Sequence, residues 1–222
     1  MKKEHKNAQK KEKIIKKYNS SAQVYDRRYK DLQFRKFKLS LGKIDLSERV
    51  LLDVGCGTGL LLDFLSHFTS SIQTTSFLYV GTDISREMLY ILRKKLKDMV
   101  VTKSKIEKLP TSIHLVVSDA EHLPFRPKVF ETILSFTVIQ NLSNNKLFFR
   151  EVLDLIKNKG DLVLSTLKKK KTDLEDFRSF CKSRVHIPEE NEIIGTEDVI
   201  YVGKTLKSPR LKDGNSYEST KR

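Results

Sequence analysis

A glycine-rich turn is the segment of this chain whose residue types most clearly suggest chemistry. Gly55, Gly57 and Gly59 stand at alternate positions between an apolar run and a leucine-rich segment. Glycine adopts positive φ angles and lets a ligand approach the backbone, and a helix that follows would offer free N–H groups to an anion. A dinucleotide-binding turn also has glycine at its sixth position, where this chain has Leu60. Asp53 precedes the first glycine and would repel a pyrophosphate, so the turn favours a ligand with a cationic end.

Two further carboxylates follow apolar runs later in the chain. Asp83 stands in Gly-Thr-Asp-Ile-Ser, and at the end of a second strand it could accept hydrogen bonds from a ribose diol. The alternative is a carboxylate that only stabilises the start of a helix through the helix dipole. Asp119 opens Asp-Ala-Glu-His-Leu-Pro-Phe and could accept from an exocyclic amine, although the segment also reads as an ordinary polar loop.

The elements that must position these residues alternate between strands and helices. Short apolar runs predict strands at 50–54, 77–80, 113–117, 130–136 and 162–166, and a last pair at 192–194 and 199–202. Helical patterns lie between them at 58–68, 85–97, 143–158 and 172–184. Such alternation predicts an α/β fold, a doubly wound seven-stranded and mostly parallel sheet. Ligands bind such sheets at the carboxyl ends of the strands, where the three segments above would meet.

The chain divides into four parts by composition. Residues 1–17 are a basic tail with eight lysines and two glutamates, and residues 1–13 lack an apolar face and are expected to be frayed. Residues 18–49 carry aromatic residues at helical spacing and are expected to form a helical cover of one or two helices. Residues 50–207 form the ligand-binding domain, and residues 208–222 are a polar C-terminal tail.

Composition excludes several classes of protein. Hydrophobic residues make up 38% of the 222 residues, and the longest apolar stretch is about seven residues against the roughly 20 that a transmembrane helix needs. The lysine-rich start is unlike a secretory signal, so a cytoplasmic protein is expected. Two cysteines cannot form a disulfide framework or a four-ligand zinc site.

Taken together, the motifs resemble class I S-adenosylmethionine-dependent methyltransferases. The resemblance is to the broad type 11 group, which includes the ubiquinone and menaquinone methyltransferases and the wobble-uridine tRNA methyltransferases. The family's Asp-x-Gly-Cys-Gly-Thr-Gly turn matches residues 53–59, its Gly-x-Asp-x-Ser-x-x-Met-Leu segment matches 81–89, and its Asp-Ala-Glu-x-Leu-Pro-Phe segment matches 119–125. The resemblance implies a Rossmann-like methyltransferase fold with S-adenosylmethionine as cofactor.

The resemblance also implies a role for each matching residue. The methionine end of the cofactor would lie on the turn, the ribose on Asp83, the adenine ring on Ile84, and the adenine amine on Asp119 and Ala120. Ser135 and Phe136 would flank the methionine and sulfonium, and Tyr18 and Tyr25 would cover the cofactor, with plain helix packing as the alternative for the tyrosines. The implied cofactor-binding residues are Tyr18, Tyr25, Asp53, Gly55, Cys56, Gly57, Gly59, Asp83, Ile84, Asp119, Ala120, Ser135 and Phe136.

No catalytic residue is assigned. Relatives often carry two histidines after the fourth strand, where this chain has Gln140 and Asn141, so these two residues are expected near the substrate. His186, before the expected sixth strand, is a third substrate-proximal candidate. A base is needed only if the acceptor is protonated at neutral pH.

The acceptor stays open between classes. Residues 1–49 carry a net charge of +10, which favours RNA (tRNA or rRNA), a ribonucleoprotein or a protein as the acceptor. Motif similarity favours a small molecule or quinone, and a non-catalytic methyltransferase-like subunit is a third alternative. A small activator protein is a further partner that we consider; the pattern gives no oligomeric state.

Overall fold

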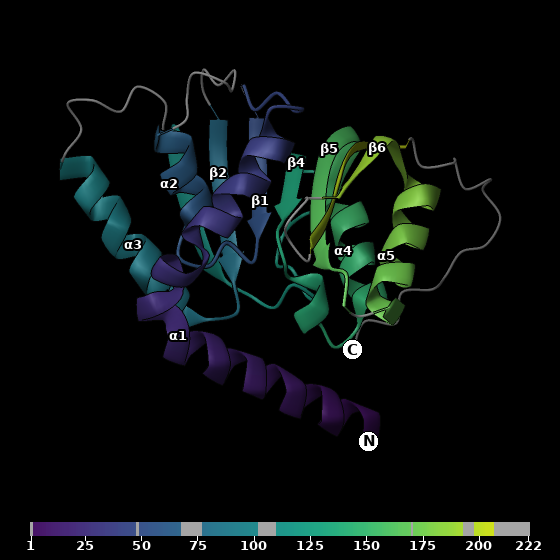
Figure 1. Ribbon diagram of the computed structural model, residues 1–222, viewed down its shortest axis with the longest axis horizontal. Helices are drawn as coiled ribbons and strands as arrows, with labels where there is room; N and C mark the ends of the chain where they lie inside the picture. Colours follow the sequence, from purple (N-terminus) through teal and green to yellow (C-terminus); the bar gives the residue numbers. More distant parts are fainter. Residues whose placement is uncertain are drawn as a thin grey trace.

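A computed structural model describes residues 2–47, 49–67, 77–101, 110–169, 171–192 and 198–206. Within them, seven strands form one sheet in the order β3-β2-β1-β4-β5-β7-β6, with helices against both faces (Figure 1). The strands are β1 (Arg49–Val54), β2 (Phe77–Asp83), β3 (Ser112–Val117), β4 (Phe130–Ser135), β5 (Ile156–Leu167), β6 (Val185–Glu192) and β7 (Asp198–Thr205). The predicted fold class is therefore confirmed.

The sheet is parallel from β3 to β5, whereas β7 is antiparallel to both β5 and β6. The chain leaves β1 toward β2 on one side and reaches β4 on the other, so the strand order reverses between β1 and β4. In open α/β sheets this switch point is where the carboxyl ends of the strands leave a crevice for a ligand.

Neighbouring strand residues point to opposite faces, which separates two cores. Leu51 belongs to a core with residues of α1 and α2, whereas Leu52 belongs to a core with residues of α4 and α5. The helices are α1 (Lys2–Leu41), α2 (Leu60–His67), α3 (Arg86–Val101), α4 (Asn145–Leu155) and α5 (Lys171–Arg184), with a short 3-10 helix at Ile139–Asn141. Cys56 and Cys181 are both buried, one in each core.

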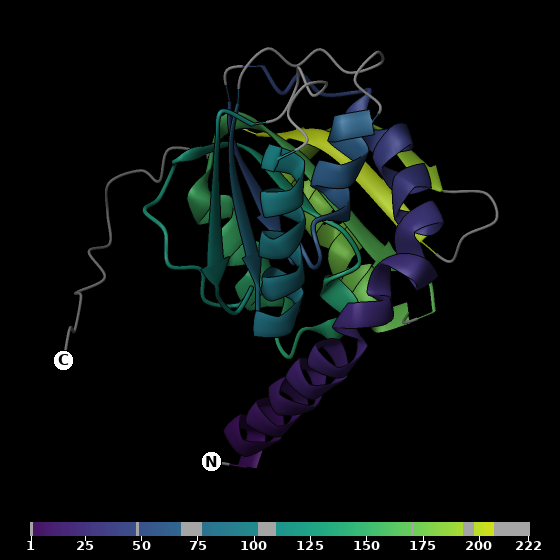
Figure 2. The ribbon, with the colours of Figure 1, turned by 90° about the vertical axis from the view of Figure 1, so that its left-hand side faces the viewer.

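The N-terminal segment differs from the expectation. Residues 1–13 were expected to be frayed, but α1 is one helix of 40 residues that begins at Lys2. Lysine, glutamate, glutamine and alanine are good helix formers, and Lys10 and Lys11 contact the body. The first half of α1 passes below the carboxyl ends of the strands and projects from the body (Figures 1 and 2).

Two other boundaries also differ. The helix expected to reach residue 158 ends at Leu155, because Ile156 is buried and pairs with Phe130 as the first residue of β5. Residues 156–158 are instead the first residues of β5. The sixth strand begins at Val185 rather than at residue 192, and it pairs with β7 as expected. In each case pairing with a distant strand overrides the local pattern.

In the part of the chain described, no helix combines the length and apolar character needed to cross a bilayer. The tail expected at residues 208–222 lies outside the described residues.

Candidate functional site

The glycine turn connects β1 to α2, and its amides donate hydrogen bonds to the end of β2. Gly55, Gly57 and Gly59 have φ angles of +77°, +56° and +80°, which other residues rarely adopt. A Cβ on Gly55 would lie 2.3 Å from Val138 Cγ2, whereas a Cβ on Gly57 would meet nothing within 4 Å. Gly55 is therefore required by packing, and Gly57 presents open backbone to the site. Gly59 packs against Leu92 of α3, away from the pocket.

Asp83 lies at the carboxyl end of β2, directly across from this turn. Its Oδ2 accepts a hydrogen bond from the Gly57 amide at 3.0 Å, and its Oδ1 accepts from the Ser85 amide at 2.8 Å. Ser85 Oγ in turn accepts from the Met88 amide at 3.2 Å, so it caps the N-terminus of α3. Burial raises the pKa of Asp83 to about 6, although these backbone hydrogen bonds act in the opposite direction.

Asp53 lies beneath the turn and faces a second, smaller cavity. It is 4% exposed, and its Oδ2 accepts from the Tyr79 hydroxyl at 2.7 Å. Burial raises its pKa to about 7. Gln33 of α1 lines the same cavity of about 30 Å³, and its Oε1 is buried without a hydrogen-bond partner among the described residues. Two buried acceptors, one of them unsatisfied, therefore face one small space beside the turn.

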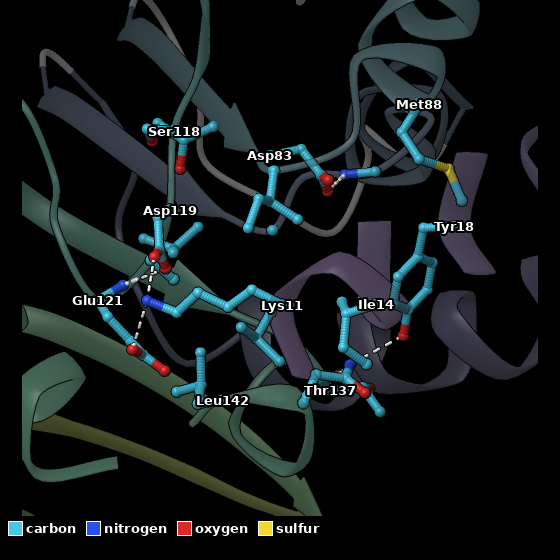
Figure 3. Close-up of a pocket in the computed structure, with 18 of the residues that line it drawn as sticks. Lys11, Ile14, Tyr18, Asp83, Met88, Ser118, Asp119, Glu121, Thr137 and Leu142 are labelled. Carbon is cyan, nitrogen blue, oxygen red and sulfur yellow. Dashed lines mark hydrogen bonds and ion pairs between the residues drawn. The ribbon is translucent and has the colours of Figure 1, made fainter. Parts of the chain in front are cut away.

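The main pocket, of about 90 Å³, opens at the switch point between β1 and β4 (Figure 3). Its lining combines the three sequence motifs with the loop after β4 and with α1. The predicted residues that line it are Tyr18, Tyr25, Gly55, Gly57, Asp83, Ile84, Asp119, Ala120, Phe136 and Asn141. Asp53 and Cys56 line the smaller cavity instead. Ser135 lines neither cavity; it is buried, and its hydroxyl donates to the Val54 carbonyl at 3.2 Å.

The tyrosines of α1 divide between the pocket and helix packing. Asn141 Nδ2 donates to the Tyr18 hydroxyl at 2.8 Å, which joins α1 to the segment after β4. Burial raises the pKa of Tyr25, which lines both cavities. Tyr29 packs on Tyr25 with ring centroids 4.7 Å apart and is 38% exposed. Gln140 is buried and donates to the Thr137 carbonyl, so only Asn141 of this pair reaches the pocket.

His186 is not near this site. It lies at the start of β6, where it pairs with Lys204 of β7, and it is exposed. β6 is the outer strand and runs parallel to β5, so its first residues lie at the amino end of the sheet, opposite the pocket. His186 was expected in a loop before the sixth strand. Because β6 begins at Val185, His186 lies within this strand, at the edge of the sheet opposite the pocket.

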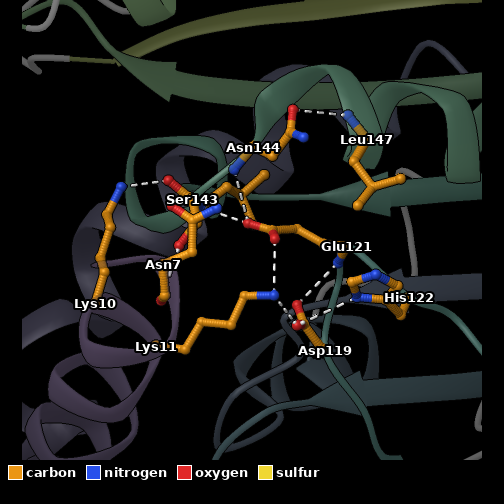
Figure 4. Close-up of polar contacts among 10 residues, drawn as sticks. Asn7, Lys10, Lys11, Asp119, Glu121, His122, Ser143, Asn144 and Leu147 are labelled. Carbon is orange, nitrogen blue, oxygen red and sulfur yellow. Dashed lines mark hydrogen bonds and ion pairs between the residues drawn. The ribbon is translucent and has the colours of Figure 1, made fainter. Parts of the chain in front are cut away.

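Lys11 reaches from α1 into the polar end of the pocket (Figure 4). Its Nζ lies 2.5 Å from Asp119 Oδ2 and 2.8 Å from Glu121 Oε2. Glu121 is almost fully buried, and its Oε1 also accepts from the amides of Ser143 and Asn144. These contacts tie the first turns of α1 to the loops that follow β3 and β4.

A buried ion pair secures the other half of α1. Lys36 Nζ lies 2.8 Å from Asp198 Oδ2 and donates to Thr137 Oγ1 at 2.6 Å, and the two charged side chains are 0% and 1% exposed. Burial lowers the pKa of Lys36, against the influence of Asp198. Thr137 lines the pocket in a left-handed conformation with φ of +62°, so this pair positions a pocket residue.

Sequence reasoning missed Lys11, Ile14 and Gln33. Steps of three and four residues lead back from Tyr18 to Ile14 and Lys11, so extending the tyrosine stripe toward the N-terminus would have found two of them. Gln33 lies four residues after Tyr29, but a glutamine in a charged helix gives no signal of burial.

Comparison with known proteins gives a consistent family. A protein-family model described as "Methyltransferase domain" matches residues 52–164 of this chain. An uncharacterized protein of Methanocaldococcus jannaschii is 31% identical over 67% of this chain and 49% of its own length. The malonyl-[acyl-carrier protein] O-methyltransferase of a Marinomonas species is 28% identical over 71% of this chain and 52% of its own. The demethylmenaquinone methyltransferase of Thermotoga maritima is 28% identical over 62% and 51%. The chain thus spans about half the length of these curated relatives.

Solved structures share the fold at low identity. A Haloferax volcanii complex of a methyltransferase with the Trm112 methyltransferase activator matches with a TM-score of 0.65 and 15% identity, over 86% of this chain and 98% of that one. A methyltransferase of Aquifex aeolicus matches with a TM-score of 0.56 and 16% identity, over 85% and 98%. At such identities the likeness shows the fold alone.

Proposed function

Because the chain belongs to the methyltransferase-domain family, we propose that it transfers a methyl group from S-adenosylmethionine to an RNA acceptor. Class I members of this family use S-adenosylmethionine as methyl donor. The observation that carries the RNA part is the position of the lysine-rich first half of α1. It crosses the carboxyl ends of the strands and contributes Lys11 and Ile14 to the pocket (Figures 1 and 3).

The nucleoside end of the cofactor fits the main pocket. The carboxylate of Asp83 would accept from the ribose hydroxyls, and Ile84 and Met88 offer apolar surface to the adenine ring. Asp119 would accept from the adenine amine, beside the backbone of Ala120. Gly57, whose position leaves open space, would let the cofactor approach the turn.

The methionine end fits the smaller cavity. An α-ammonium group carries three N–H donors and a positive charge, and this cavity holds the buried carboxylate of Asp53 and the unsatisfied Oε1 of Gln33. Both groups are acceptors, so the cavity suits a cation and disfavours a phosphate. This orphaned buried oxygen supports the assignment of the cofactor to this chain's own residues.

The chain's contribution to the reaction would be orientation and exclusion of water. S-adenosylmethionine supplies a methyl group that its sulfonium already activates. Phe136, Ile14 and Tyr18 would shield the donor, and aligning the acceptor atom with the methyl group would supply most of the rate. We assign no general base, since Glu121 is engaged by Lys11 and two amides, and His122 is exposed.

The acceptor is proposed from charge. Residues 1–17 carry a net charge of +6, and Lys6, Lys13, Lys16 and Lys17 are exposed along α1. A polyanion on this helix would release counterions, and its affinity would fall by about 0.7–0.9 log units per phosphate contact for each log unit of salt. A helix of this charge beside the pocket would therefore hold RNA near the methyl donor.

A variant in which neutral glutamines replace three lysines tests the RNA acceptor. Lys6→Gln/Lys13→Gln/Lys16→Gln should weaken RNA binding. It should also make the slope of log affinity against log salt shallower, by the amount expected for the loss of about two to three phosphate contacts. The matched control Arg93→Gln/Lys94→Gln/Lys97→Gln removes three exposed charges from α3 and should have a smaller effect. Equal salt slopes for the wild-type protein and the first variant would contradict the proposal.

A small-molecule acceptor is the second candidate, favoured by the names of the relatives. These include a demethylmenaquinone methyltransferase and a malonyl-[acyl-carrier protein] O-methyltransferase. Leu142, Val138 and Phe136 also give the pocket apolar walls that a quinone ring could contact. With a small-molecule acceptor, labelled methyl from S-adenosylmethionine should appear in a lipid or small-molecule fraction. The Lys6→Gln/Lys13→Gln/Lys16→Gln variant should then be fully active.

We also propose a small activator protein as partner, supported by the Haloferax volcanii complex with Trm112. Co-expression with a Trm112-type protein should then yield a complex that co-elutes on size exclusion. The proposal would be contradicted if the chain stayed monomeric in the presence of the Trm112-type protein, with full cofactor affinity and unchanged activity.

A further inference from the structure

Lys11 binds one carboxylate oxygen of Asp119, and both residues line the pocket. Asp119 Oδ1 accepts from the Glu121 amide at 2.9 Å, within the loop. Its Oδ2 is bound by Lys11 Nζ at 2.5 Å, and the exposed ring of His122 lies 3.6 Å from the same oxygen. The oxygen left for a ligand is therefore the one that the ammonium of Lys11 holds (Figure 4).

We propose that Lys11 competes with the adenine amine of the cofactor for Asp119, so that cofactor binding displaces the first turns of α1. The inference rests on the proposed function, which assigns Asp119 to the adenine amine. An amine and an ammonium are both donors, and both would approach Asp119 from inside the pocket. Glu121 would keep the amides of Ser143 and Asn144 as donors after Lys11 leaves, which lowers the cost of the displacement.

The first turns of α1 are held weakly enough for such a displacement. Besides Lys11, this segment contacts the body through Lys10, at the Leu142 carbonyl, and through a 3.5 Å hydrogen bond from Ser143 to the Asn7 carbonyl. Most side chains from Glu4 to Lys13 are exposed, so little apolar surface would be lost. Later residues of the helix contact α2 and α3, for example Phe37 on Phe64 and Asp26 on Lys95, and this part would stay in place.

The exchange would couple the two ligands of the proposed reaction. When the cofactor displaces the first turns of α1, their lysines would become available to bind an RNA backbone. RNA bound to the displaced turns would likewise favour cofactor binding. Such coupling is reciprocal, because each ligand changes the affinity for the other by the same factor. Lys11 would then determine cofactor affinity as well as the order of loading.

Calorimetry with S-adenosylhomocysteine tests the competition. Lys11→Met keeps a side chain of similar length without the charge, and Lys13→Met removes an exposed charge from the same helix as control. Lys11→Met should bind about two- to fivefold more tightly than wild type, the range expected for a partly exposed ion pair. Wild-type affinity should rise with salt more than that of the variant. Equal or weaker binding by Lys11→Met would overturn the proposal.

Hydrogen–deuterium exchange tests the displacement separately. S-adenosylhomocysteine should accelerate exchange in residues 4–13, whereas its inosine analogue, with a carbonyl oxygen in place of the amine, should not. Binding of S-adenosylhomocysteine with unchanged or slower exchange would overturn this inference and leave the proposed function standing. Failure of every variant to bind S-adenosylhomocysteine would instead refute the proposed function and the inference together.

Discussion

Asp83 accepts a hydrogen bond from the backbone amide of Gly57 at 3.0 Å, so the end of β2 supports the glycine turn that follows β1. The same carboxylate lines the pocket. One residue therefore shapes the turn and presents acceptors to a ligand, and its loss should affect both.

Asp83→Ala should weaken S-adenosylhomocysteine binding at least tenfold. The removed charge-assisted hydrogen bonds to a ribose diol correspond to about 1.5–3 kcal/mol. Calorimetry measures the change, and far-UV circular dichroism checks that the variant is folded. Glu87→Ala, an exposed carboxylate on α3, is the control and should bind as wild type. Unchanged affinity in folded Asp83→Ala would rule out the ribose contact.

Cofactor affinity should rise with pH through neutrality. The pKa of Asp53 is raised to about 7, so at pH 6 the carboxyl is mostly protonated and cannot pair with an ammonium. Binding favours the ionised form, and from pH 6 to pH 8 the affinity for S-adenosylhomocysteine should increase about tenfold. Ionisation of Asp83, with a pKa of about 6, adds to the change at the lower end.

The variant Asp53→Asn distinguishes the contribution of Asp53 to this pH dependence from that of Asp83. The amide oxygen introduced at position 53 can still accept from Tyr79. Between pH 7 and pH 8 the affinity of the variant for S-adenosylhomocysteine should be lower than that of wild type and nearly constant. A variant that keeps the wild-type pH profile would show that Asp53 does not face the ammonium group.

Gln33→Leu should discriminate between ligands that differ only at the methionine end. S-adenosylhomocysteine should bind about tenfold more weakly because Oε1 no longer accepts from the ammonium. 5′-Methylthioadenosine, which lacks the amino-acid group, should bind within about twofold of wild type. Gln9→Leu, on an exposed part of the same helix, is the control. An equal loss for both ligands would indicate a structural role for Gln33.

Lys36→Met should destabilise the fold by about 3 kcal/mol, because Asp198 stays buried after losing its cation. The double variant Lys36→Met/Asp198→Leu should recover most of this loss in urea unfolding. A single variant as stable as wild type would show that the pair contributes nothing to holding α1 against Thr137.

The pocket's motif residues could be predicted because local sequence determines them. Gly57 and Asp83 follow apolar runs that become strands β1 and β2, and the parallel pairing of these strands brings their ends together. The helical stripe of Tyr18 extends to Lys11, but neither the contact of Lys11 with Asp119 nor the place of His186 could be predicted in the same way. The position of Lys11 depends on where a 40-residue helix crosses the sheet, and that of His186 on where β6 begins along β7. Both depend on contacts between segments distant in sequence, which local periodicity does not encode.

Transfer of labelled methyl from S-adenosylmethionine to fractionated cell RNA, protein and lipid tests the account most directly. We expect label in the RNA fraction with the wild-type protein, about tenfold less with Asp83→Ala at limiting cofactor, and reduced label with the Lys6→Gln/Lys13→Gln/Lys16→Gln variant. Label in the lipid or small-molecule fraction alone would refute the RNA acceptor and keep methyl transfer. No transfer to any fraction, by a protein that does not bind S-adenosylhomocysteine, would contradict the central claim.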